Sequence, residues 1–206
     1  HTFTHQTGAC NARNLALDQV EADWVFLADD DLRIPKDFLK QAQAFIQAEK
    51  PQAFTVSCLQ DGEIEPEKTV IQWPAFGSGC SFVKASTVKT IRFDLALEHG
   101  FGEDADFGMQ LRKAGVDILY NPFLKLIHLK APSGGFRKPI EKPWDKENPA
   151  PNPAPTVLAS IIKHATPAQI LGYKTLLFLK FYKLQQIKNP FSYIRQMRKR
   201  WEVSLF

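Results

Sequence analysis

An apolar run ends abruptly in three carboxylates at Val25-Phe26-Leu27-Ala28-Asp29-Asp30-Asp31. Such a run, followed at once by charge, is typical of a buried central strand whose carboxyl end opens into a crevice. The aspartates would then lie at the edge of a sheet, where a bound divalent cation is the simplest way to keep them all ionised. Asp29 and Asp31 are spaced so that both carboxylates can reach one ion. The alternative is a solvated turn in which Asp31 caps the next helix.

The composition is that of an ordinary globular protein. The chain has 206 residues, 44% hydrophobic and 23% charged, enough to bury a core in one domain or in one domain with an extension. The three cysteines (Cys10, Cys58 and Cys80) lack metal-binding spacing, so we expect reduced thiols in a cytosolic chain. No stretch reaches ~18 uncharged apolar residues, so no transmembrane helix is predicted. No signal peptide precedes the first motif, and we expect the chain to be truncated at its amino end.

Charge is distributed unevenly along the chain. From Thr156 onward there are nine lysines and arginines against one acid, whereas the preceding part has seventeen against twenty-one. An acidic front with a basic tail argues against an enzyme that binds nucleic acid over a basic face. It favours a tail that contacts something anionic.

The elements around the aspartates indicate an α/β fold. Residues 8–20 have a helical apolar period behind a glycine turn, and Arg13 at the helix start could face an anion or simply be exposed. A second helix is expected to begin with Pro35 and to end near Lys50. Residues 53–59 read as a strand, and residues 73–84 as a loop that leads into another. The glycines of this loop either admit a ligand close to the backbone or make ordinary turns.

A second acidic cluster opens another expected helix at residues 101–115, where Gly115 is a stop signal. Glu103, Asp104 and Asp106 crowd the amino end of this helix, where the dipole favours acids. Capping explains one acid and not three. A carboxylate held there could act as a general base, which is worth roughly 10²–10⁴ in rate.

The rest of the chain predicts a strand end followed by helices. Residues 116–120 and 123–127 are expected to form two short strands, and the second leads to His128, which suits either a metal ligand or a structural role. Six prolines between residues 139 and 155 predict an irregular connector. The remaining patterns predict helices at 156–164, 167–182 and 190–201.

Together these motifs resemble those of family 2 glycosyltransferases of the GT-A fold. Residues 8–14 are similar to the family's Gly-x-x-x-Ala-Arg-Asn helix start, and residues 26–31 to its Asp-x-Asp strand end. Residues 102–106, followed by Arg112 and Gly115, resemble the Glu-Asp motif that supplies the base. The same block is similar to a segment of the carboxy-terminal galactosyltransferase domain. The resemblance covers residues 7 to about 137, and the motifs come in the family's order.

The sequence departs from the family pattern in two ways. The family opens with strand-helix-strand elements that hold the nucleotide base, and this chain starts after them. The first acid of the family's commonest Asp-Ala-Asp-Asp version is Ala28 in this register. The metal ligands must therefore come from residues 29–31, with Asp31 the first choice.

The resemblance implies a GT-A type, Rossmann-like mixed sheet with flanking helices, truncated at the amino end and followed by a helical carboxy-terminal extension. The implied domains are a partial catalytic core at residues 1–137, a Pro-rich connector at 138–155 and a basic helical extension at 156–206.

The implied activity is an inverting, divalent-metal-dependent transfer of a sugar from a nucleotide-sugar, expected to be UDP-linked, to an acceptor hydroxyl in polysaccharide or glycolipid synthesis. Asp104 would be the base, with Glu103 orienting it or the acceptor. Mn²⁺ or Mg²⁺ would be held by Asp29, Asp31 and His128, and the imidazole favours Mn²⁺. A lid over the donor is expected at Gly134-Gly135. Donor contacts are implied for Arg13, Asn14, Asp30, Gly79, Lys130 and Arg137.

Two other classes of protein share part of this pattern. A catalytically silent module would use the acidic crevice for a metal and a saccharide, and a nucleotidyltransferase would share the metal chemistry without the Glu-Asp base. The expected partners are a nucleotide-sugar, a saccharide or lipid-linked acceptor and an anionic membrane, with no nucleic acid. We expect a cytoplasmic location, at the inner face of the membrane if the basic tail binds lipid.

Overall fold

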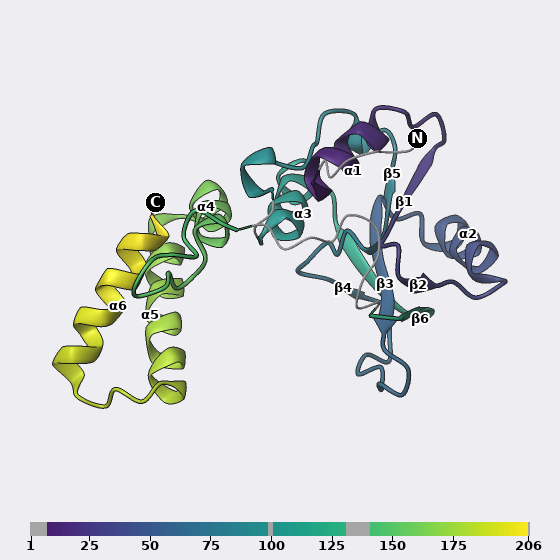
Figure 1. Ribbon diagram of the computed structural model, residues 1–206. Helices are drawn as coiled ribbons and strands as arrows, with labels where there is room; N and C mark the ends of the chain where they lie inside the picture. The colour runs from purple at the N-terminus through teal and green to yellow at the C-terminus, as the bar shows by residue number, and fades with distance from the viewer. Residues whose placement is uncertain (1–7, 99–100, 131–140, 206) are drawn as a thin grey trace. The chain divides into compact units, whose positions relative to one another are not determined.

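The computed structural model describes residues 8–98, 101–130 and 141–205 (Figure 1). By its internal contacts the chain forms two compact units. The first, here called the sheet unit, comprises His1–Phe93 and Phe107–Lys138, and the second, the helical unit, comprises Asp94–Asp106 and Pro139–Phe206. Packing thus joins residues 94–106 to the carboxy-terminal part of the chain, whereas the domains expected from the sequence follow chain order.

The sheet unit is built on a six-stranded mixed sheet with the order β1-β5-β3-β6-β2, and β4 pairs with β6. Strands β3 and β6 are parallel, and the other pairs are antiparallel. The strands expected at residues 23–29 and 53–59 are present. The strand bounds are β1 Trp24–Ala28, β2 Leu32–Arg33, β3 Ala53–Leu59, β4 Ile71–Gln72, β5 Cys80–Lys84 and β6 Ile118–His128.

The prediction of two short strands before His128 was wrong, because β6 is one strand with an irregularity inside it. Val56 of β3 pairs with Asn121, but the next residue, Ser57, pairs with Lys125. Pro122 has no N–H to donate, and the side-chain oxygen of Asn121 accepts a hydrogen bond from the Phe123 amide (2.9 Å). The bulge therefore interrupts the ladder without ending the strand.

Three helices flank this sheet: α1 Ala9–Leu17, α2 Phe38–Glu49 and the later part of α3 Glu103–Lys113. Helix α2 begins later than predicted, because Pro35 opens a turn whose carbonyl accepts the Phe38 amide (3.1 Å). It ends as expected at Lys50, which is left-handed (φ 48°).

The core fills both faces of the sheet. Neighbouring residues of one strand point to opposite faces, so Ala53 and Phe54 belong to different apolar clusters. Phe54 stacks on Phe82 with ring centroids 4.7 Å apart, on the face that α2 covers. Helices α1 and α3 pack on the other face (Figure 1).

The helical unit contains the short 3-10 turn η2 Leu95–Leu97 and the helices α4 Pro155–His164, α5 Pro167–Leu184 and α6 Pro190–Ser204. All three helices were predicted, and α5 and α6 extend slightly further than expected. Helices α5 and α6 form an antiparallel hairpin (Figure 1), in which the centroid of the buried Tyr193 ring lies 4.7 Å from that of Phe178. The Ser204 hydroxyl donates to the Pro153 carbonyl (2.6 Å), which ties the Pro-rich segment to α6. Within the described ranges, no helix has both the length and the hydropathy to cross a membrane.

Candidate active site

The carboxyl end of β1 places Asp29 against the loop that precedes β5. The Asp29 amide donates to the Gly79 carbonyl (3.0 Å), and a Cβ at position 79 would lie only 2.2 Å from Oδ2 of Asp29. The Asp29 carboxylate thus lies directly against the backbone of Gly79, and a larger residue at position 79 would displace it. The close approach predicted for this loop is made by the protein's own aspartate.

Arg13 on α1 contributes a cation to the same end of the sheet. Its Nη2 lies 3.4 Å from Oδ1 of Asp29, and its guanidinium lies 5.3 Å from the centroid of the Phe93 ring. Its Nη1 is buried and has no hydrogen-bond partner in the described part of the chain. An N–H group in this state suits an oxygen of an anionic ligand.

Asn14 on α1, another predicted donor contact, is hydrogen-bonded to the segment that contains Phe93. Its amide nitrogen donates to the Phe93 carbonyl, and its oxygen accepts from the Phe93 amide, both at 2.9 Å. These two bonds fix the segment that leads to Asp94. The structure thus gives Asn14 a positioning role, and contact with the donor stays a prediction.

Asp31 and His128 meet where β2 begins and β6 ends. Leu32 pairs with His128 in the ladder, and the Leu129 amide donates to the Asp31 carbonyl (2.9 Å). Oδ2 of Asp31 lies 3.3 Å from Nε2 of His128. The Asp31 side chain is only 8% exposed and that of His128 is 33% exposed. Because Asp31 precedes a strand, the alternative in which it caps a helix is wrong.

These residues fit a metal ion in part. Asp31 and His128 are close enough to bind one ion together, and a carboxylate with an imidazole suits Mn²⁺. Across residues 8–98, 101–130 and 141–205, no three His, Cys, Asp or Glu side chains are arranged to hold an ion. The predicted set of Asp29, Asp31 and His128 is therefore not assembled as three, since Asp29 contacts Arg13 instead. Asp30 beside them is exposed.

All three cysteines are free thiols, as expected. A hydrogen bond with Cys80 holds the pKa of the Cys58 thiol below its usual value, although burial and the charges of Asp29 and Asp31 act in the opposite direction. The two thiols thus belong to the same end of the sheet as the aspartates.

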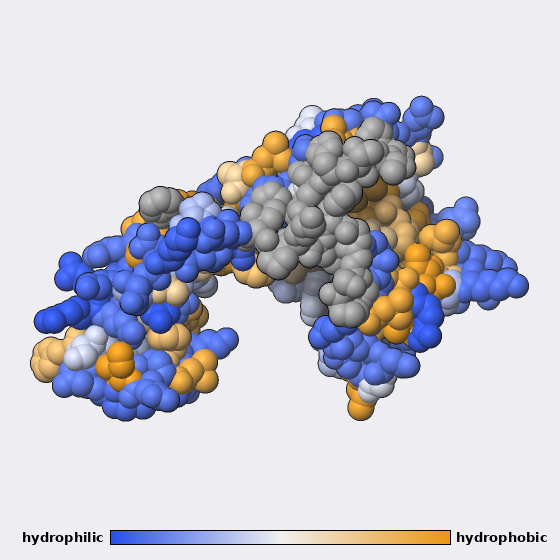
Figure 2. Space-filling view, viewed as in Figure 1, coloured by the Kyte–Doolittle hydropathy of each residue, from blue (hydrophilic) through white to orange (hydrophobic). Residues whose placement is uncertain are grey.

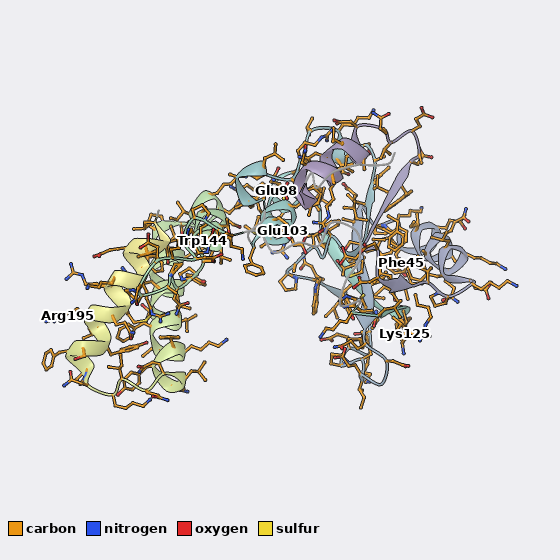
Figure 3. All side chains as sticks on the ribbon, in the orientation of Figure 1. Phe45, Glu98, Glu103, Lys125, Trp144 and Arg195 are labelled. Carbon is orange, nitrogen blue, oxygen red and sulfur yellow. The ribbon has the colours of Figure 1, made fainter. Side chains whose placement is uncertain are left out.

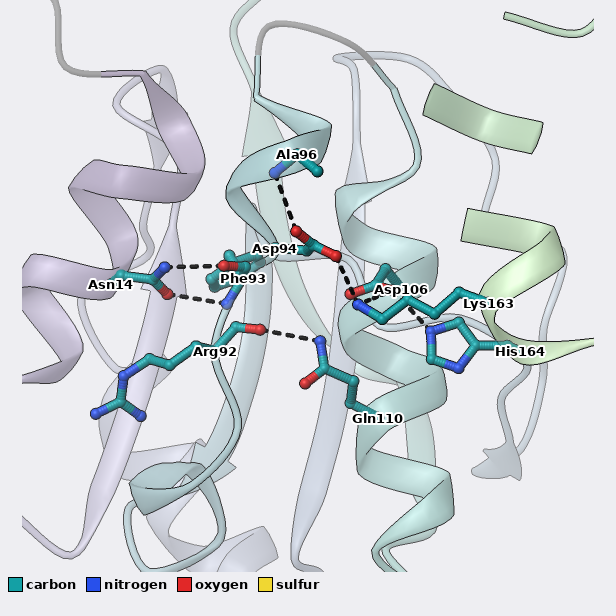
Figure 4. A network of polar contacts seen from close by, with 9 residues as sticks. All are labelled: Asn14, Arg92, Phe93, Asp94, Ala96, Asp106, Gln110, Lys163 and His164. Carbon is teal, nitrogen blue, oxygen red and sulfur yellow. Dashed lines mark hydrogen bonds and ion pairs between the residues drawn. The ribbon is translucent and has the colours of Figure 1, made fainter. Parts of the chain in front are cut away.

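The second acidic cluster lies at the start of α3, within the helical unit (Figure 3 labels Glu103). Glu103 and Asp104 are half-buried, so both can be reached from solvent. Asp106 is fully buried. Its Oδ1 lies 2.7 Å from Nε2 of His164 and 2.9 Å from Nζ of Lys163 (Figure 4). The cluster therefore divides into two accessible acids and one that is neutralised inside the unit.

Lys163 also pairs with Asp94, at 2.7 Å from Oδ2 (Figure 4). The hydrogen bond from Lys163 and the one from the Ala96 amide keep the pKa of Asp94 below its usual value. Burial tends to lower the pKa of Lys163, but its bonds to Asp94 and Asp106 outweigh burial and raise it. Sequence reasoning missed Lys163, His164 and Asp94. The one available signal was the adjacent lysine and histidine in the last turn of α4, a pattern typical of dipole compensation.

The remaining predicted residues are less defined. Lys130 is exposed and left-handed (φ 48°) just after β6. Arg137 and the Gly134-Gly135 lid lie outside the described residues. Asp29, Asp31 and His128 belong to the sheet unit, and Glu103 and Asp104 to the helical unit.

The sequence model of glycosyl transferase family 2 matches residues 2–112. The comparison with curated proteins gives no match. Among solved structures, this fold is similar to the crystal structure of Staphylococcus aureus TarS 1-349 in complex with UDP-GlcNAc, with a TM-score of 0.58 and 20% identity over 96% of this chain and 60% of that chain. It is also similar to GalNAc-T7 with UDP, GalNAc and Mn²⁺, with a TM-score of 0.58 and 12% identity over 96% of this chain and 42% of that chain.

Both similarities confirm the predicted fold class, a mixed sheet of the GT-A type with a helical carboxy-terminal extension. The chain spans less than two thirds of the length of either relative, 60% of TarS and 42% of GalNAc-T7.

Proposed function

The chain belongs to glycosyl transferase family 2, and on this basis we propose that it transfers a sugar from a UDP-sugar to an acceptor hydroxyl with inversion at the anomeric carbon. The observation that carries the proposal is the extent of the match. Residues 2–112 include Arg13, the three aspartates after β1 and the Glu103-Asp104 pair. The UDP-GlcNAc in TarS and the UDP in GalNAc-T7 support UDP as the nucleotide.

Arg13 is the residue best prepared to meet the donor diphosphate. Its unpartnered Nη1 can donate to a phosphate oxygen, while Nη2 stays near Asp29. Lys130, exposed two residues after His128 at the end of β6, adds a second cation.

Asp31 and His128 are the proposed ligands of a divalent ion, with Mn²⁺ preferred over Mg²⁺ because of the imidazole. Such an ion would act as a Lewis acid that neutralises the departing UDP. Asp29, whose carboxylate is 45% exposed beside Arg13, would be a third ligand only if that ion pair opens.

Asp104 is the proposed general base. In the transfer, the acceptor oxygen forms a bond to the anomeric carbon as the bond to the UDP oxygen breaks, and UDP leaves with that electron pair. The hydroxyl proton passes to the Asp104 carboxylate. Attack from the face opposite UDP inverts the configuration, and Glu103 beside it would orient the acceptor or the base.

The acceptor is proposed to be a lipid-linked or polysaccharide chain at an anionic membrane, because the α5–α6 hairpin combines exposed apolar side chains with cations. Leu184 is 77% and Phe191 is 81% exposed, on the two sides of the turn between the helices. Figure 2 shows orange apolar side chains among blue polar ones over this hairpin. A surface of this kind complements anionic headgroups.

The proposed function is tested by incubating the protein with a panel of UDP-sugars and Mn²⁺ and measuring release of UDP with and without saccharide acceptors. A transferase should release UDP from one donor slowly without acceptor and faster with one. A silent binding module should bind without releasing UDP. A nucleotidyltransferase should instead form UDP-sugar from UTP and a sugar phosphate, with release of pyrophosphate.

A further inference from the structure

Helix α4 contacts the residues that lead into the first turn of α3, within the helical unit. The Phe101 amide donates to Oγ1 of Thr156 at the start of α4 (3.0 Å). Gly102 is left-handed (φ 107°), and a Cβ there would lie 3.4 Å from both Cβ of Ser160 and the Thr156 carbonyl oxygen. The chain therefore passes directly over α4 just before Glu103 and Asp104.

The other end of α4 holds the same turn through Asp106. The Gly102 carbonyl accepts the Asp106 amide (2.8 Å), so Asp106 closes the turn that contains Asp104. Its buried carboxylate accepts from Nε2 of His164 and from Lys163 (Figure 4). No described residue hydrogen-bonds Nδ1 of His164, so its contact with Asp106 is the one polar contact that orients this imidazole.

A buried carboxylate is tolerated only when it is paired. Here His164 and Lys163, both on α4, pair with Asp106. Lys163 extends the connection to Asp94, whose Oδ1 accepts the Ala96 amide (3.0 Å). The network thus joins η2, the first turn of α3 and the end of α4. It also keeps the charge of Asp106 from adding to that of Glu103 and Asp104 on the same turn.

We propose that His164, Lys163 and Thr156 are positioning residues, which act through Asp106 and Phe101 to hold Asp104 in its reactive geometry. This inference rests on the proposed function, in which Asp104 is the base. On this view, α4 affects catalysis only through Asp106 and Phe101, because none of its residues touches the substrate. A small displacement of a base lowers turnover strongly while it leaves donor binding, which uses residues of the sheet unit, unchanged.

Four variants of the whole chain test the inference. His164→Leu removes the donor to Asp106, and His164→Gln keeps an N–H near the position of Nε2. Thr156→Val removes the hydroxyl that binds the Phe101 amide and keeps the side-chain shape. Thr175→Val is the matched control, because the Thr175 hydroxyl donates only to the Leu171 carbonyl within exposed α5.

The first measurement is amide hydrogen exchange at residues 101–106. We expect faster exchange in His164→Leu and in Thr156→Val, and parental exchange in His164→Gln and Thr175→Val. Unchanged exchange in both His164→Leu and Thr156→Val would overturn the proposed positioning of this turn by α4, whether or not the protein is an enzyme.

The second measurement is UDP release with Mn²⁺ over a range of UDP-sugar concentrations up to saturation, well below the unfolding temperature. We expect kcat to fall by about 10-fold or more in His164→Leu and by a smaller factor in Thr156→Val, with KM for the donor unchanged and His164→Gln near the parent. Equal kcat in all four folded variants, or a loss that follows thermal stability alone, would reduce the network to a structural one. No UDP release by the parent protein would contradict the proposed function itself. The exchange measurement does not depend on activity, so it tests the positioning of residues 101–106 separately from the proposed function.

Discussion

Oδ2 of Asp31 lies 3.3 Å from Nε2 of His128, although the two residues are far apart in the chain. The pairing of Leu32 with His128 in the β2–β6 ladder brings them together. A carboxylate and an imidazole at this separation can either pair with one another or share a cation. Binding of Mn²⁺ distinguishes the two states, because only the second one holds the ion.

Asp31→Asn should abolish or strongly weaken Mn²⁺-dependent binding of UDP while the fold stays intact, because the change removes a charge and no core volume. The expected loss in affinity is at least about 10-fold, since even residues that only support a metal ligand contribute this much. Calorimetric titration of UDP with and without Mn²⁺ measures it. Asp37→Asn is the control, because Asp37 is exposed and caps α2 without a side-chain hydrogen bond. An unchanged Mn²⁺ titration in a folded Asp31→Asn variant would sink the assignment.

Gly79→Ala should displace the Asp29 carboxylate, because the new Cβ would lie 2.2 Å from Oδ2. Asp29 is partly exposed and can move, so we expect a change of less than about 1 kcal/mol in the free energy of unfolding. Binding of UDP should weaken several-fold as the contact with Arg13 changes. Gly77→Ala is the matched control, since its Cβ would meet Sγ of Cys80 at an ordinary 3.5 Å. Equal UDP affinity in the two variants would show that the position of Asp29 does not matter for the donor.

Asp104→Asn should lower kcat by about 10²-fold or more with little effect on binding of the UDP-sugar, the pattern of a group needed mainly in the transition state. Steady-state kinetics with donor and acceptor, together with donor titration, separate the two effects. Asp61→Asn serves as a control, because its carboxylate is 90% exposed and pairs only loosely with Arg33 at 4.0 Å. Turnover equal to that of the parent would return Asp104 to a role at the helix terminus.

The fold was predictable where a local pattern was enough. The apolar run before Asp29, the strand at residues 53–59 and the helices after residue 155 are each specified by their own composition and period. The interruption of β6 was misread as a strand end, because Asn121-Pro122 is a typical turn signal. Only the parallel pairing with β3 on both sides of the bulge shows that the strand continues.

The site was predictable in its residue types and not in its pairings. The motifs located Arg13, the aspartates and the acids of α3, but no local pattern could show that Arg13 contacts Asp29 or that Gly79 makes room for it. The partners of Asp106 come from α4, a long way along the chain. Such contacts depend on tertiary packing, which a single sequence does not display.

Tyr120→Phe should destabilise the sheet unit in a pH-dependent way. The Tyr120 hydroxyl donates to Oε2 of Glu65 (2.6 Å), and burial together with this bond raises the pKa of Tyr120. Burial alone would raise the pKa of Glu65, but hydrogen bonds from Ser57, Tyr120 and the Glu67 amide outweigh it and lower that pKa. A lowered carboxylate pKa stabilises the fold above the unfolded value of about 4.3, and the contribution is lost as the pH falls through the folded value.

The variant should therefore lose about 1–3 kcal/mol at about pH 7 and less at an acidic pH below the folded pKa of Glu65, where this carboxyl is protonated. Urea unfolding at the two pH values measures the difference. Tyr182→Phe, which removes a long 3.3 Å bond to the Lys188 carbonyl at an exposed site, should cost little at either pH. A loss of equal size at both pH values would mean that the hydroxyl does not stabilise the charged form of Glu65.

The α5–α6 hairpin should bind anionic vesicles through both its apolar and its basic side chains. Leu184 and Phe191 are largely exposed, and inserting each into lipid is worth roughly 1.5–3 kcal/mol. Lys180 and Lys183 on α5, the helix that ends at Leu184, are also exposed. Each cation near an anionic surface adds about 1 kcal/mol. Co-sedimentation with vesicles of phosphatidylglycerol and phosphatidylcholine, compared with phosphatidylcholine alone, measures the binding.

The parent should sediment only with the anionic vesicles, and less so as salt screens the charges. The double variant Leu184→Ser with Phe191→Ser should reduce the bound fraction by at least about 10-fold in partition coefficient, and Lys180→Glu with Lys183→Glu should reduce it further at low salt. Neither pair of sites is buried, so the fold should be unaffected. Ile64→Ser, at an 85% exposed apolar site of the sheet unit, should bind like the parent. Binding that is independent of salt or of anionic lipid, or no binding at all, would instead make the hairpin a surface for protein contacts.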